Sequence, residues 1–418
     1  MKFSRNIIRI ITLVALLFLF CCSVFYGQSP SIEELYFQGV DLLDNQKQYE
    51  EALPFFENIL EKNPEHADSY FQIGKIYQNT GQLEKAAISF QKSIDFRPSY
   101  SSAFYQLGLT SLELQKKEDA LEAFKQAIRL NPDFHRAHYG LGLVYNELKR
   151  YDDSIESFEQ ALLIEPNDAQ TYYGLGITYE QIGEYEKSID ALKNAIKYQK
   201  DYGKAFYHLG LNYNTLGKLT ESIENFIEAA TLLSDVADTI YYEIGMMYRK
   251  MGGRNEEAIQ YLKKATEINP DFADAFFYIG WLYNGLKNYD KTIDAYQEVI
   301  KINPDYTYIY YNIGWAYGED KKYQEAVNAF NEAVKKNEND ADSYYGLGWA
   351  YNELEDYENA VKALTSAIRL QPDHVYAHYS LGMAYLVMGD RNAALDEYKI
   401  LMDLDKEIAN RLFDLIYQ

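Results

Sequence analysis

The sequence predicts an all-α protein built as an array of similar helical pairs. Three observations support this prediction: a glycine that recurs every 34 or 35 residues, apolar residues at helical spacing on both sides of it, and a proline after most of the repeats. A fixed period of this length is typical of repeat architectures, in which each repeat buries its apolar face against its neighbours. The glycine recurs at Gly39, Gly74, Gly108, Gly142, Gly176, Gly210, Gly245, Gly280, Gly314, Gly348 and Gly382.

We number each repeat so that its glycine is position 8. Each repeat is expected to contain two helices. In the first, helix A, positions 4, 7, 8 and 11 lie on one helical face, as Tyr172, Leu175 and Tyr179 illustrate. In the second, helix B, positions 20, 21, 24, 27 and 28 form the matching stripe, which includes Ala326 and Phe330. Helices of about a dozen residues are too short to be stable alone, so stacking must stabilise the array.

Small residues and prolines mark the packing and the ends of the repeats. A glycine inside a helix costs roughly 1 kcal/mol relative to alanine, so its recurrence indicates a steric need for close helix approach. Position 20 is also small in every repeat, as in Ala120 and Ser188. Proline cannot continue a helix interior, so a proline after helix B separates the repeats. It occupies position 32 at Pro64, Pro98, Pro132, Pro166, Pro270, Pro304 and Pro372.

These features resemble the tetratricopeptide repeat, whose small residue at 8, tyrosine at 11, aromatic at 24 and proline at 32 are visible in Gly280, Tyr283, Tyr296 and Pro304, while its alanine at 20 is visible in other repeats, as at Ala326. Thr292 departs from the family's alanine. The resemblance implies a right-handed α-solenoid of about eleven helix-turn-helix repeats over residues 32–408, followed by a C-terminal capping helix over 409–418. It also implies a concave groove that is lined by helix A, chiefly at positions 2, 5, 9, 12 and 13.

Positions 5, 9 and 12 of helix A share a helical face separate from the apolar stripe. Aromatic rings offer rigid contact area and asparagine amides can pair with a peptide backbone, so this face predicts a site for an extended peptide. Alternatively, the aromatic residues at position 5 pack against the next repeat, and the tryptophans at position 9 are half-buried there. The candidate residues are Tyr139, Tyr173, Tyr207, Phe277, Tyr311 and Tyr345 at position 5, Trp281, Trp315 and Trp349 at position 9, and Asn146, Asn214, Asn284 and Asn352 at position 12.

Other chemistries find little support in the sequence. Some tetratricopeptide proteins bind acidic chaperone tails through lysine at position 5 and asparagine at position 9, and neither occurs here. His135 with His138, and His374 with His378, have spacings that bring two rings near one helical face, but a third ligand is not evident. We therefore expect no metal, no cofactor and no catalytic residues, and we expect that the protein is not an enzyme.

Residues 1–27 have the layout of an export signal, with basic residues before an apolar run, and residues 28–31 form a short linker. Three outcomes are open: cleavage after Gly27, lipid attachment at Cys22, or retention as an uncleaved membrane anchor. In each case the repeats are expected to lie outside the cytoplasm, either in the periplasm or anchored to the membrane. Membrane association is expected through the N-terminus only.

The formal charge of −23 restricts the expected partners. Binding to nucleic acid requires a basic surface, so nucleic acid is excluded, whereas attraction to cationic partners is favoured. The sequence thus predicts a scaffold that binds a partner protein or an extended peptide. The alternative is a structural spacer or accessory subunit of a cell-envelope assembly, contacting partners through its ends or its convex face.

Overall fold

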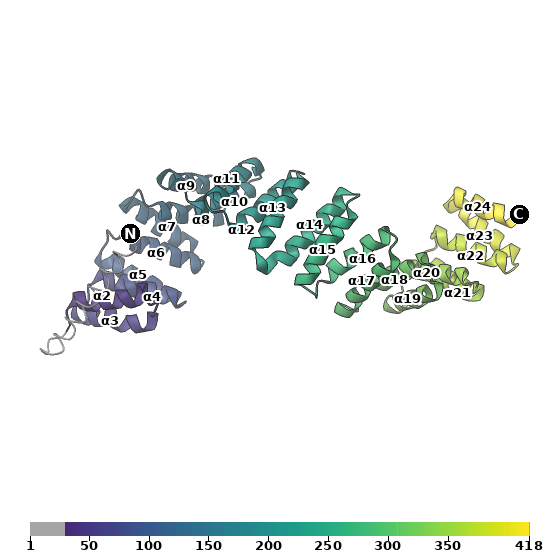
Figure 1. Ribbon diagram of the computed structural model, residues 1–418, viewed down its shortest axis with the longest axis horizontal. Coiled ribbons are helices and arrows are strands. Elements are labelled where there is room, and N and C mark those ends of the chain that lie inside the picture. Colours follow the sequence, from purple (N-terminus) through teal and green to yellow (C-terminus); the bar gives the residue numbers. More distant parts are fainter. Residues whose placement is uncertain (1–29, 307, 418) are drawn as a thin grey trace. The chain divides into compact units, whose positions relative to one another are not determined.

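The computed structural model describes residues 30–306 and 308–417, and within them it contains α-helices, one short 3-10 helix and no strand (Figure 1). The predicted all-α fold class is thereby confirmed. The helices are α2 (Ile32–Asp44), α3 (Tyr49–Lys62), α4 (Ala67–Asn79), α5 (Leu83–Phe96), α6 (Ser101–Glu113), α7 (Lys117–Leu130), α8 (His135–Glu147), α9 (Tyr151–Ile164), α10 (Ala169–Gln181), α11 (Tyr185–Tyr198), α12 (Gly203–Thr215), α13 (Leu219–Leu232), η1 (Ser234–Val236), α14 (Ala237–Met251), α15 (Asn255–Ile268), α16 (Ala273–Gly285), α17 (Tyr289–Ile302), α18 (Ile309–Glu319), α19 (Tyr323–Lys336), α20 (Ala341–Glu353), α21 (Tyr357–Leu370), α22 (Val375–Val387), α23 (Arg391–Leu404) and α24 (Lys406–Tyr417).

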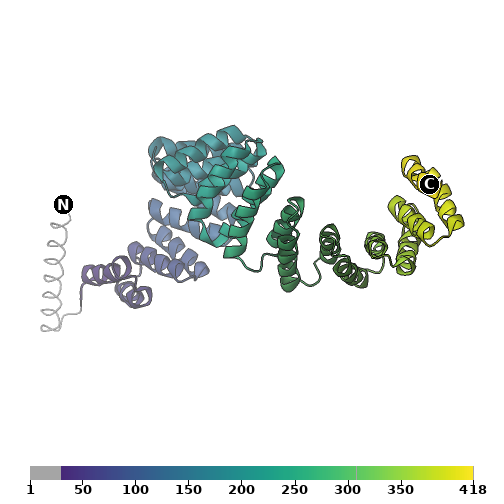
Figure 2. The same ribbon diagram turned by 45° about the vertical axis from the view of Figure 1, so that its right-hand side comes forward.

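The chain divides into two compact units, Met1–Leu216 and Gly217–Gln418. Unit 1 contains α2 to α12 and unit 2 contains α13 to α24, so the sixth repeat is divided between them. Within each unit every helix packs against the next one along the chain, as Figure 2 also shows. Several A helices additionally contact the A helix of the following repeat, for example α20 and α22.

The recurring glycine allows a large side chain of helix B to lie directly on helix A. In the eighth repeat, a Cβ atom at Gly280 would lie 2.6 Å from Cε1 of Tyr296, a side chain that is only 2% exposed. The residue at position 24 therefore fills the space that position 8 leaves open. Close helix approach at position 8 was expected, and the small residues at position 20, such as Ala326, are buried beside it.

Irregularities of the repeat occur in the turns. The turn between helix A and helix B contains a residue with positive φ, which is glycine at Gly81 (74°) but lysine at Lys287 (57°). Gly252 and Gly253 both have positive φ, at 70° and 65°, where the doubled glycine predicts an irregular turn. The short 3-10 helix η1 absorbs an inserted residue ahead of α14.

The last helix, α24, begins at Lys406, three residues before the expected start of the capping helix at 409. Its Leu412 is buried against Gly382 of α22, where a Cβ atom would come within 2.6 Å of the leucine. Ile416, which is 4% exposed, stands at the position that is glycine in the repeats. A further helix B therefore could not approach α24 as closely as helix B approaches helix A elsewhere.

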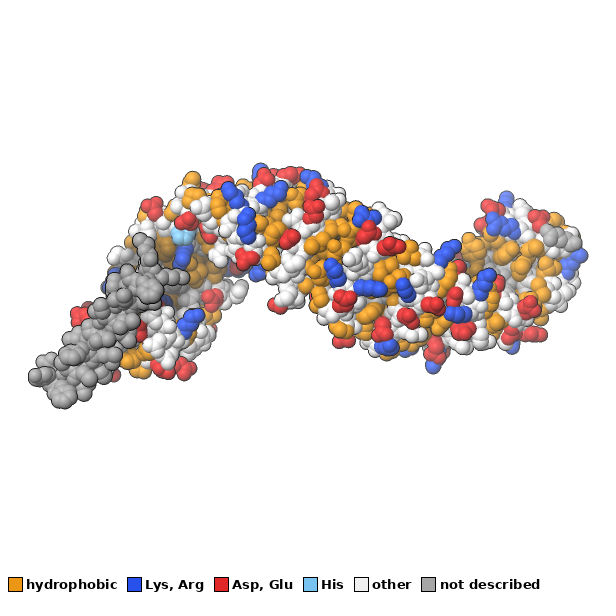
Figure 3. All heavy atoms as spheres, in the orientation of Figure 1, with side chains coloured by type: hydrophobic (Ala, Val, Ile, Leu, Met, Phe, Trp, Pro, Cys, Tyr) orange, Lys and Arg blue, Asp and Glu red, His pale blue; other side chains and the backbone are white. Residues whose placement is uncertain are grey.

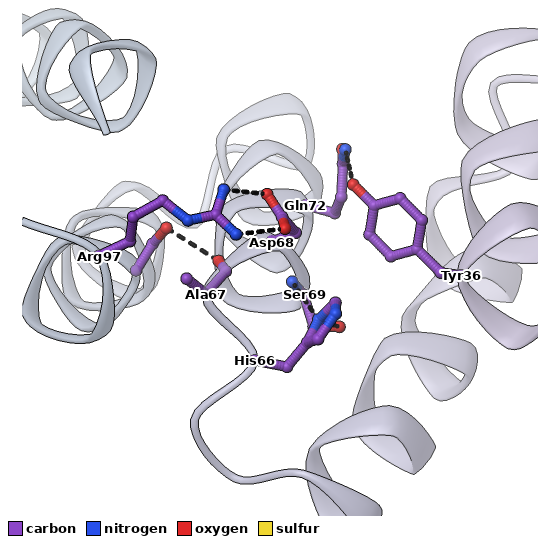
Figure 4. A network of polar contacts seen from close by, with 8 residues as sticks. Tyr36, His66, Ala67, Asp68, Ser69, Gln72 and Arg97 are labelled. Atoms are coloured by element: carbon purple, nitrogen blue, oxygen red, sulfur yellow. Dashed lines mark hydrogen bonds and ion pairs between the residues drawn. The ribbon is translucent and has the colours of Figure 1, made fainter. Parts of the chain in front are cut away.

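Polar contacts stabilise the first two repeats of unit 1 (Figure 4). Arg97, at the end of α5, donates to both carboxylate oxygens of Asp68 on α4, at 2.8 and 2.6 Å. Burial opposes ionisation of Asp68, but the Arg97 guanidinium outweighs it and lowers the pKa of this carboxyl. Gln72 of α4 donates to the hydroxyl of Tyr36 on α2, at 3.0 Å. The Gln72–Tyr36 bond therefore joins two successive A helices, and the Arg97–Asp68 pair joins the two helices of the second repeat.

Candidate functional site

The candidate residues lie on A helices in both units, and we call the surface formed by positions 5, 9 and 12 the 5-9-12 face. All of them are half-buried except Trp281, which is 46% exposed. In unit 1 the face includes Tyr139 and Asn146 on α8, Tyr173 on α10, and Tyr207 and Asn214 on α12. In unit 2 it includes Phe277, Trp281 and Asn284 on α16, Tyr311 and Trp315 on α18, and Tyr345, Trp349 and Asn352 on α20.

Three of the six candidate aromatic residues at position 5 contact an aromatic ring in the segment that leads into the next A helix. The ring centroids are 5.0 Å apart for Tyr173 and Tyr202, 5.4 Å for Phe277 and Tyr306, and 4.9 Å for Tyr345 and His374. Burial raises the pKa of the Tyr139, Tyr173, Tyr311 and Tyr345 hydroxyls. Packing between repeats, one of the two alternatives for this position, accounts for these contacts.

The three tryptophans follow one another at the same repeat position but do not form one stack. Trp315 and Trp349 lie with their ring centroids 4.9 Å apart and their planes at 30°. The Trp349 ring lies directly on Gly318, where a Cβ atom would overlap it, so glycine replaces asparagine at position 12 there. Trp281 does not stack with the other two, and its ring is the most exposed on the 5-9-12 face.

The asparagines at position 12 point their carbonyl oxygens inward. The Oδ1 atoms of Asn146, Asn284 and Asn352 are buried and have no hydrogen-bond partner within the described residues. Asn352 donates its amide to the carbonyl oxygen of Ser380 in the next repeat, at 3.1 Å. A buried carbonyl oxygen without a donor costs about 1–3 kcal/mol, and its burial also keeps it out of reach of a partner at the surface.

Sequence reasoning missed one functional candidate, Arg249 of α14. It occupies position 12, and its guanidinium carbon lies 5.0 Å from the ring centroid of Tyr278 and 5.4 Å from that of Trp281. Its Nε atom is buried and has no hydrogen-bond partner among residues 30–306 and 308–417. The signal was present in the sequence, because no other repeat carries a basic residue at position 12.

The histidines that were weighed as metal ligands make other contacts. Nε2 of His138 lies 2.9 Å from the carbonyl oxygen of Pro132. Nε2 of His378 lies 2.9 Å from that of Pro372, and its Nδ1 lies 2.6 Å from Glu397. Within the part of the chain that the structure describes, no group of three or more histidine, cysteine, aspartate or glutamate side chains is placed to hold a metal ion.

Acidic and basic side chains are scattered among hydrophobic ones on the face that Figure 3 shows. On that face the excess of negative charge is therefore not gathered into a single acidic surface. Over residues 30–306 and 308–417, no helix combines the length and the apolar character needed to span a bilayer. The expected signal or anchor, with Cys22, lies outside the described residues.

Solved structures with similar folds include MamA from Desulfovibrio magneticus RS-1 (residues 41 to the end), at 25% identity and a TM-score of 0.39, covering 41% of this chain and 96% of that one. PilW, described as a widely conserved type IV pilus biogenesis factor, is 18% identical with a TM-score of 0.44, covering 50% and 96%. YrrB, described as a TPR protein with an unusual peptide-binding site, is 20% identical with a TM-score of 0.38, covering 43% and 93%. No curated protein matches the sequence.

Family models match much of the repeat array. Models of the tetratricopeptide repeat match residues 105–170 and 311–364, 252–287 and 349–389, 157–190, 203–232, and 273–306. A model of subunit 3 of the anaphase-promoting complex, cyclosome, matches residues 45–127. With its periodic glycines and successive helical pairs, this chain belongs to the tetratricopeptide repeat family.

Proposed function

We propose that the protein is a non-catalytic scaffold that holds an extended segment of a partner protein against its A helices. The observation that carries this proposal is the exposure of Trp281, a large aromatic side chain left 46% accessible on the 5-9-12 face. Tryptophan is enriched among the residues that dominate protein–protein binding energy. The side-chain carbonyl oxygens of Asn146 and Asn284 are buried, so it is their NH2 groups that can donate hydrogen bonds to a peptide carbonyl.

The candidate residues at position 5 differ in role from those at positions 9 and 12. Position 5 builds the array, since its rings contact the neighbouring repeat. Trp315 and Trp349 stack on each other and present a half-buried aromatic surface. Trp281 and the position-12 residues then provide the contacts to the partner.

The test compares partner capture by the full chain with capture by the Trp281→Ala variant. The full chain is immobilised, incubated with detergent extract of the native cell envelope, and the captured proteins are quantified by mass spectrometry. We expect Trp281→Ala to weaken capture about tenfold, because truncation of such an anchor typically costs more than 1 kcal/mol. Leu163→Ala on α9 is the matched control, since that side chain is 74% exposed and lies on a B helix.

Equal capture by the native chain and Trp281→Ala would contradict the proposal. Extending the change to Trp315→Ala and Trp349→Ala then shows whether any part of the aromatic surface contributes. Circular dichroism of each variant distinguishes lost binding from lost folding, which matters because Trp315 and Trp349 also pack between repeats.

The proposal includes a location outside the cytoplasm, based on the basic start and apolar run of residues 1–27. Intact-mass measurement of the protein in the periplasmic, membrane and cytosolic fractions of its native cells distinguishes the three outcomes. A chain that begins at Gln28, a lipid on Cys22, or a retained Met1 in the membrane fraction would each agree with export. An intact N-terminus in the cytosolic fraction would contradict it.

A second candidate function, a spacer that contacts partners through its ends, is favoured by the surface of α24. Phe413 and Tyr417 lie with ring centroids 4.4 Å apart, and Arg391 covers Tyr417 at 4.6 Å. Both rings are exposed in part. If capture depends on Tyr417 and not on Trp281, the end contact replaces the 5-9-12 face as the binding surface.

A further inference from the structure

Arg249 differs from the paired arginines of the chain in what surrounds it. Its guanidinium lies within cation–π distance of two rings, Tyr278 and Trp281, both on α16. No carboxylate lies within 4 Å of it among the described residues. By contrast, salt bridges join Arg97 to Asp68, Arg150 to Asp153, Arg254 to Glu257 and Arg411 to Glu407.

The two rings hold the guanidinium without using its hydrogen-bond donors. A cation–π contact involves the charge and the ring face, whereas the five N–H groups of arginine point outward in the guanidinium plane. The Nε donor of Arg249 is buried and unpaired, while the side chain as a whole is half-buried. Because Nε is out of reach of solvent, a carboxylate approaching from outside would pair with the two terminal nitrogens of Arg249, whose N–H groups lie in the guanidinium plane and can form two parallel bonds.

The ordinary structural role of a basic residue at this place is to complement the C-terminal end of a helix. Arg249 lies in the last turn of α14, where a positive charge is favourable. Lys250, the next residue, is exposed and supplies the same charge there. The ring contacts of Arg249 are therefore not explained by the helix end alone.

We propose that Arg249, Tyr278 and Trp281 form a recognition site for an aspartate or glutamate side chain of an extended partner segment, with an apolar side chain beside it on Trp281. The carboxylate accepts N–H bonds from Arg249, and the neighbouring apolar side chain packs on the exposed indole. This inference rests on the proposed peptide-binding function and specifies its chemistry at one place. The positive charge of Arg249 and the exposed Trp281 beside it complement an acidic residue next to an apolar one.

A side chain fits the site better than the end of a chain. On the 5-9-12 face of unit 2, side-chain contacts join α14 to α16 through Arg249 and Trp281, and α18 to α20 through Trp315 and Trp349. An extended segment that follows these helices presents its side chains along its length. The other group that could supply a carboxylate to Arg249 is the C-terminus of the partner, and the test below distinguishes the two.

The test uses a displayed library of random twelve-residue peptides, with free and with blocked C-termini, selected in parallel on the full chain and on three variants. The variants are Arg249→Gln, Trp281→Ala and, as the matched control, Arg369→Gln, an exposed arginine on α21 in the same unit. On the native chain we expect enrichment of peptides in which an acidic residue lies within two positions of an apolar one. For individual peptides, Arg249→Gln should weaken binding about tenfold, and replacing the peptide's acid by its amide should add little further loss. Arg369→Gln should behave as the native chain.

Each contrary outcome overturns a defined part of the proposal. If enriched peptides show no acidic preference, or bind Arg249→Gln equally well, the carboxylate site is wrong while the peptide-binding function stands. If only peptides with free C-termini are enriched, the carboxylate is a chain end and the side-chain assignment is wrong. If no peptide is enriched on the native chain, this inference and the proposed function both fail for peptides of this length.

Discussion

The contact between Gly280 and Tyr296 shows how one residue type sets the spacing within a repeat. The buried tyrosine ring occupies the space that a side chain at position 280 would need. Gly285, the last residue of the same helix α16, has no atom within 4 Å of an added Cβ. The same substitution therefore has opposite expected effects at the two positions.

We expect Gly280→Ala to destabilise the protein and Gly285→Ala to leave it unchanged or slightly more stable. Overpacking a core costs typically 1–3 kcal/mol, and replacing glycine inside a helix returns about 1 kcal/mol, so Gly280→Ala should lose up to about 2 kcal/mol. Gly285→Ala meets no steric opposition and keeps only the gain. Urea unfolding followed by circular dichroism measures both; equal stability of the two variants would contradict the close contact at position 8.

Single residues also show what sequence reasoning could and could not reach. The glycine at position 8 could be assigned a packing role, because glycine destabilises a helix interior and its recurrence there requires a compensating close contact. Arg249 was missed because its role depends on Tyr278 and Trp281 of the next repeat. To predict that contact, one must know that position 12 of one A helix lies beside positions 6 and 9 of the following A helix, and the repeat pattern does not state this. The sequence likewise did not show that Trp315 and Trp349 contact each other while Trp281 stays exposed.

At the scale of elements, the pairing of α22 with α23 includes a buried histidine–carboxylate contact. The two ring nitrogens of His378 face acceptors, the carbonyl oxygen of Pro372 and the carboxylate of Glu397. A neutral imidazole can donate to only one of them, so both bonds require the protonated ring. The hydrogen bond to Glu397 raises the pKa of His378 against the opposing effect of burial.

A raised pKa in the folded state fixes the sign of the pH dependence. The His378 contribution to stability is fully present below the unfolded pKa of about 6.5 and is lost as the pH rises through the higher folded pKa. In hydrogen exchange corrected for intrinsic rates, protection of α22 and α23 should fall as the pH rises above about 6.5. His378→Gln should abolish that difference, whereas His138→Gln, which removes a ring bonded to Pro132 but not to a carboxylate, should not change it. A pH-dependent loss that persists in His378→Gln would assign the effect to another group.

The helix α24 packs on α22 and α23 in the place that helix A of a further repeat would take. We expect Leu412→Ala to destabilise this end of the array by about 3 kcal/mol, because the leucine is fully buried against α22. Asp414→Ala, on the exposed side of the same helix, serves as the control. Since repeats contact only their neighbours, hydrogen exchange should rise in α22 to α24 and stay low in α16 and α17. A uniform rise across unit 2 would instead show that the array unfolds as a whole.

At the scale of the whole molecule, sequence periodicity was sufficient for the fold but not for the surface. The glycine spacing and the two helical stripes predict the succession of helical pairs, and small shifts in helix starts, such as Lys406 for α24, follow from turn geometry that the pattern does not encode. The same framework recurs in proteins with different partners, so fold alone does not specify function. Which side of the helices binds is decided by exposure, and exposure depends on contacts between repeats.

The most direct test of the binding surface is site-specific photo-crosslinking in the native cell envelope. A photoreactive phenylalanine analogue is placed at position 281 on α16, at position 163 on α9, or at position 417 on α24. We predict that a partner protein is crosslinked from position 281 and not from the other two, with the crosslink mapped to an acidic stretch of the partner. Crosslinking from position 163 or 417 alone would contradict binding on the 5-9-12 face.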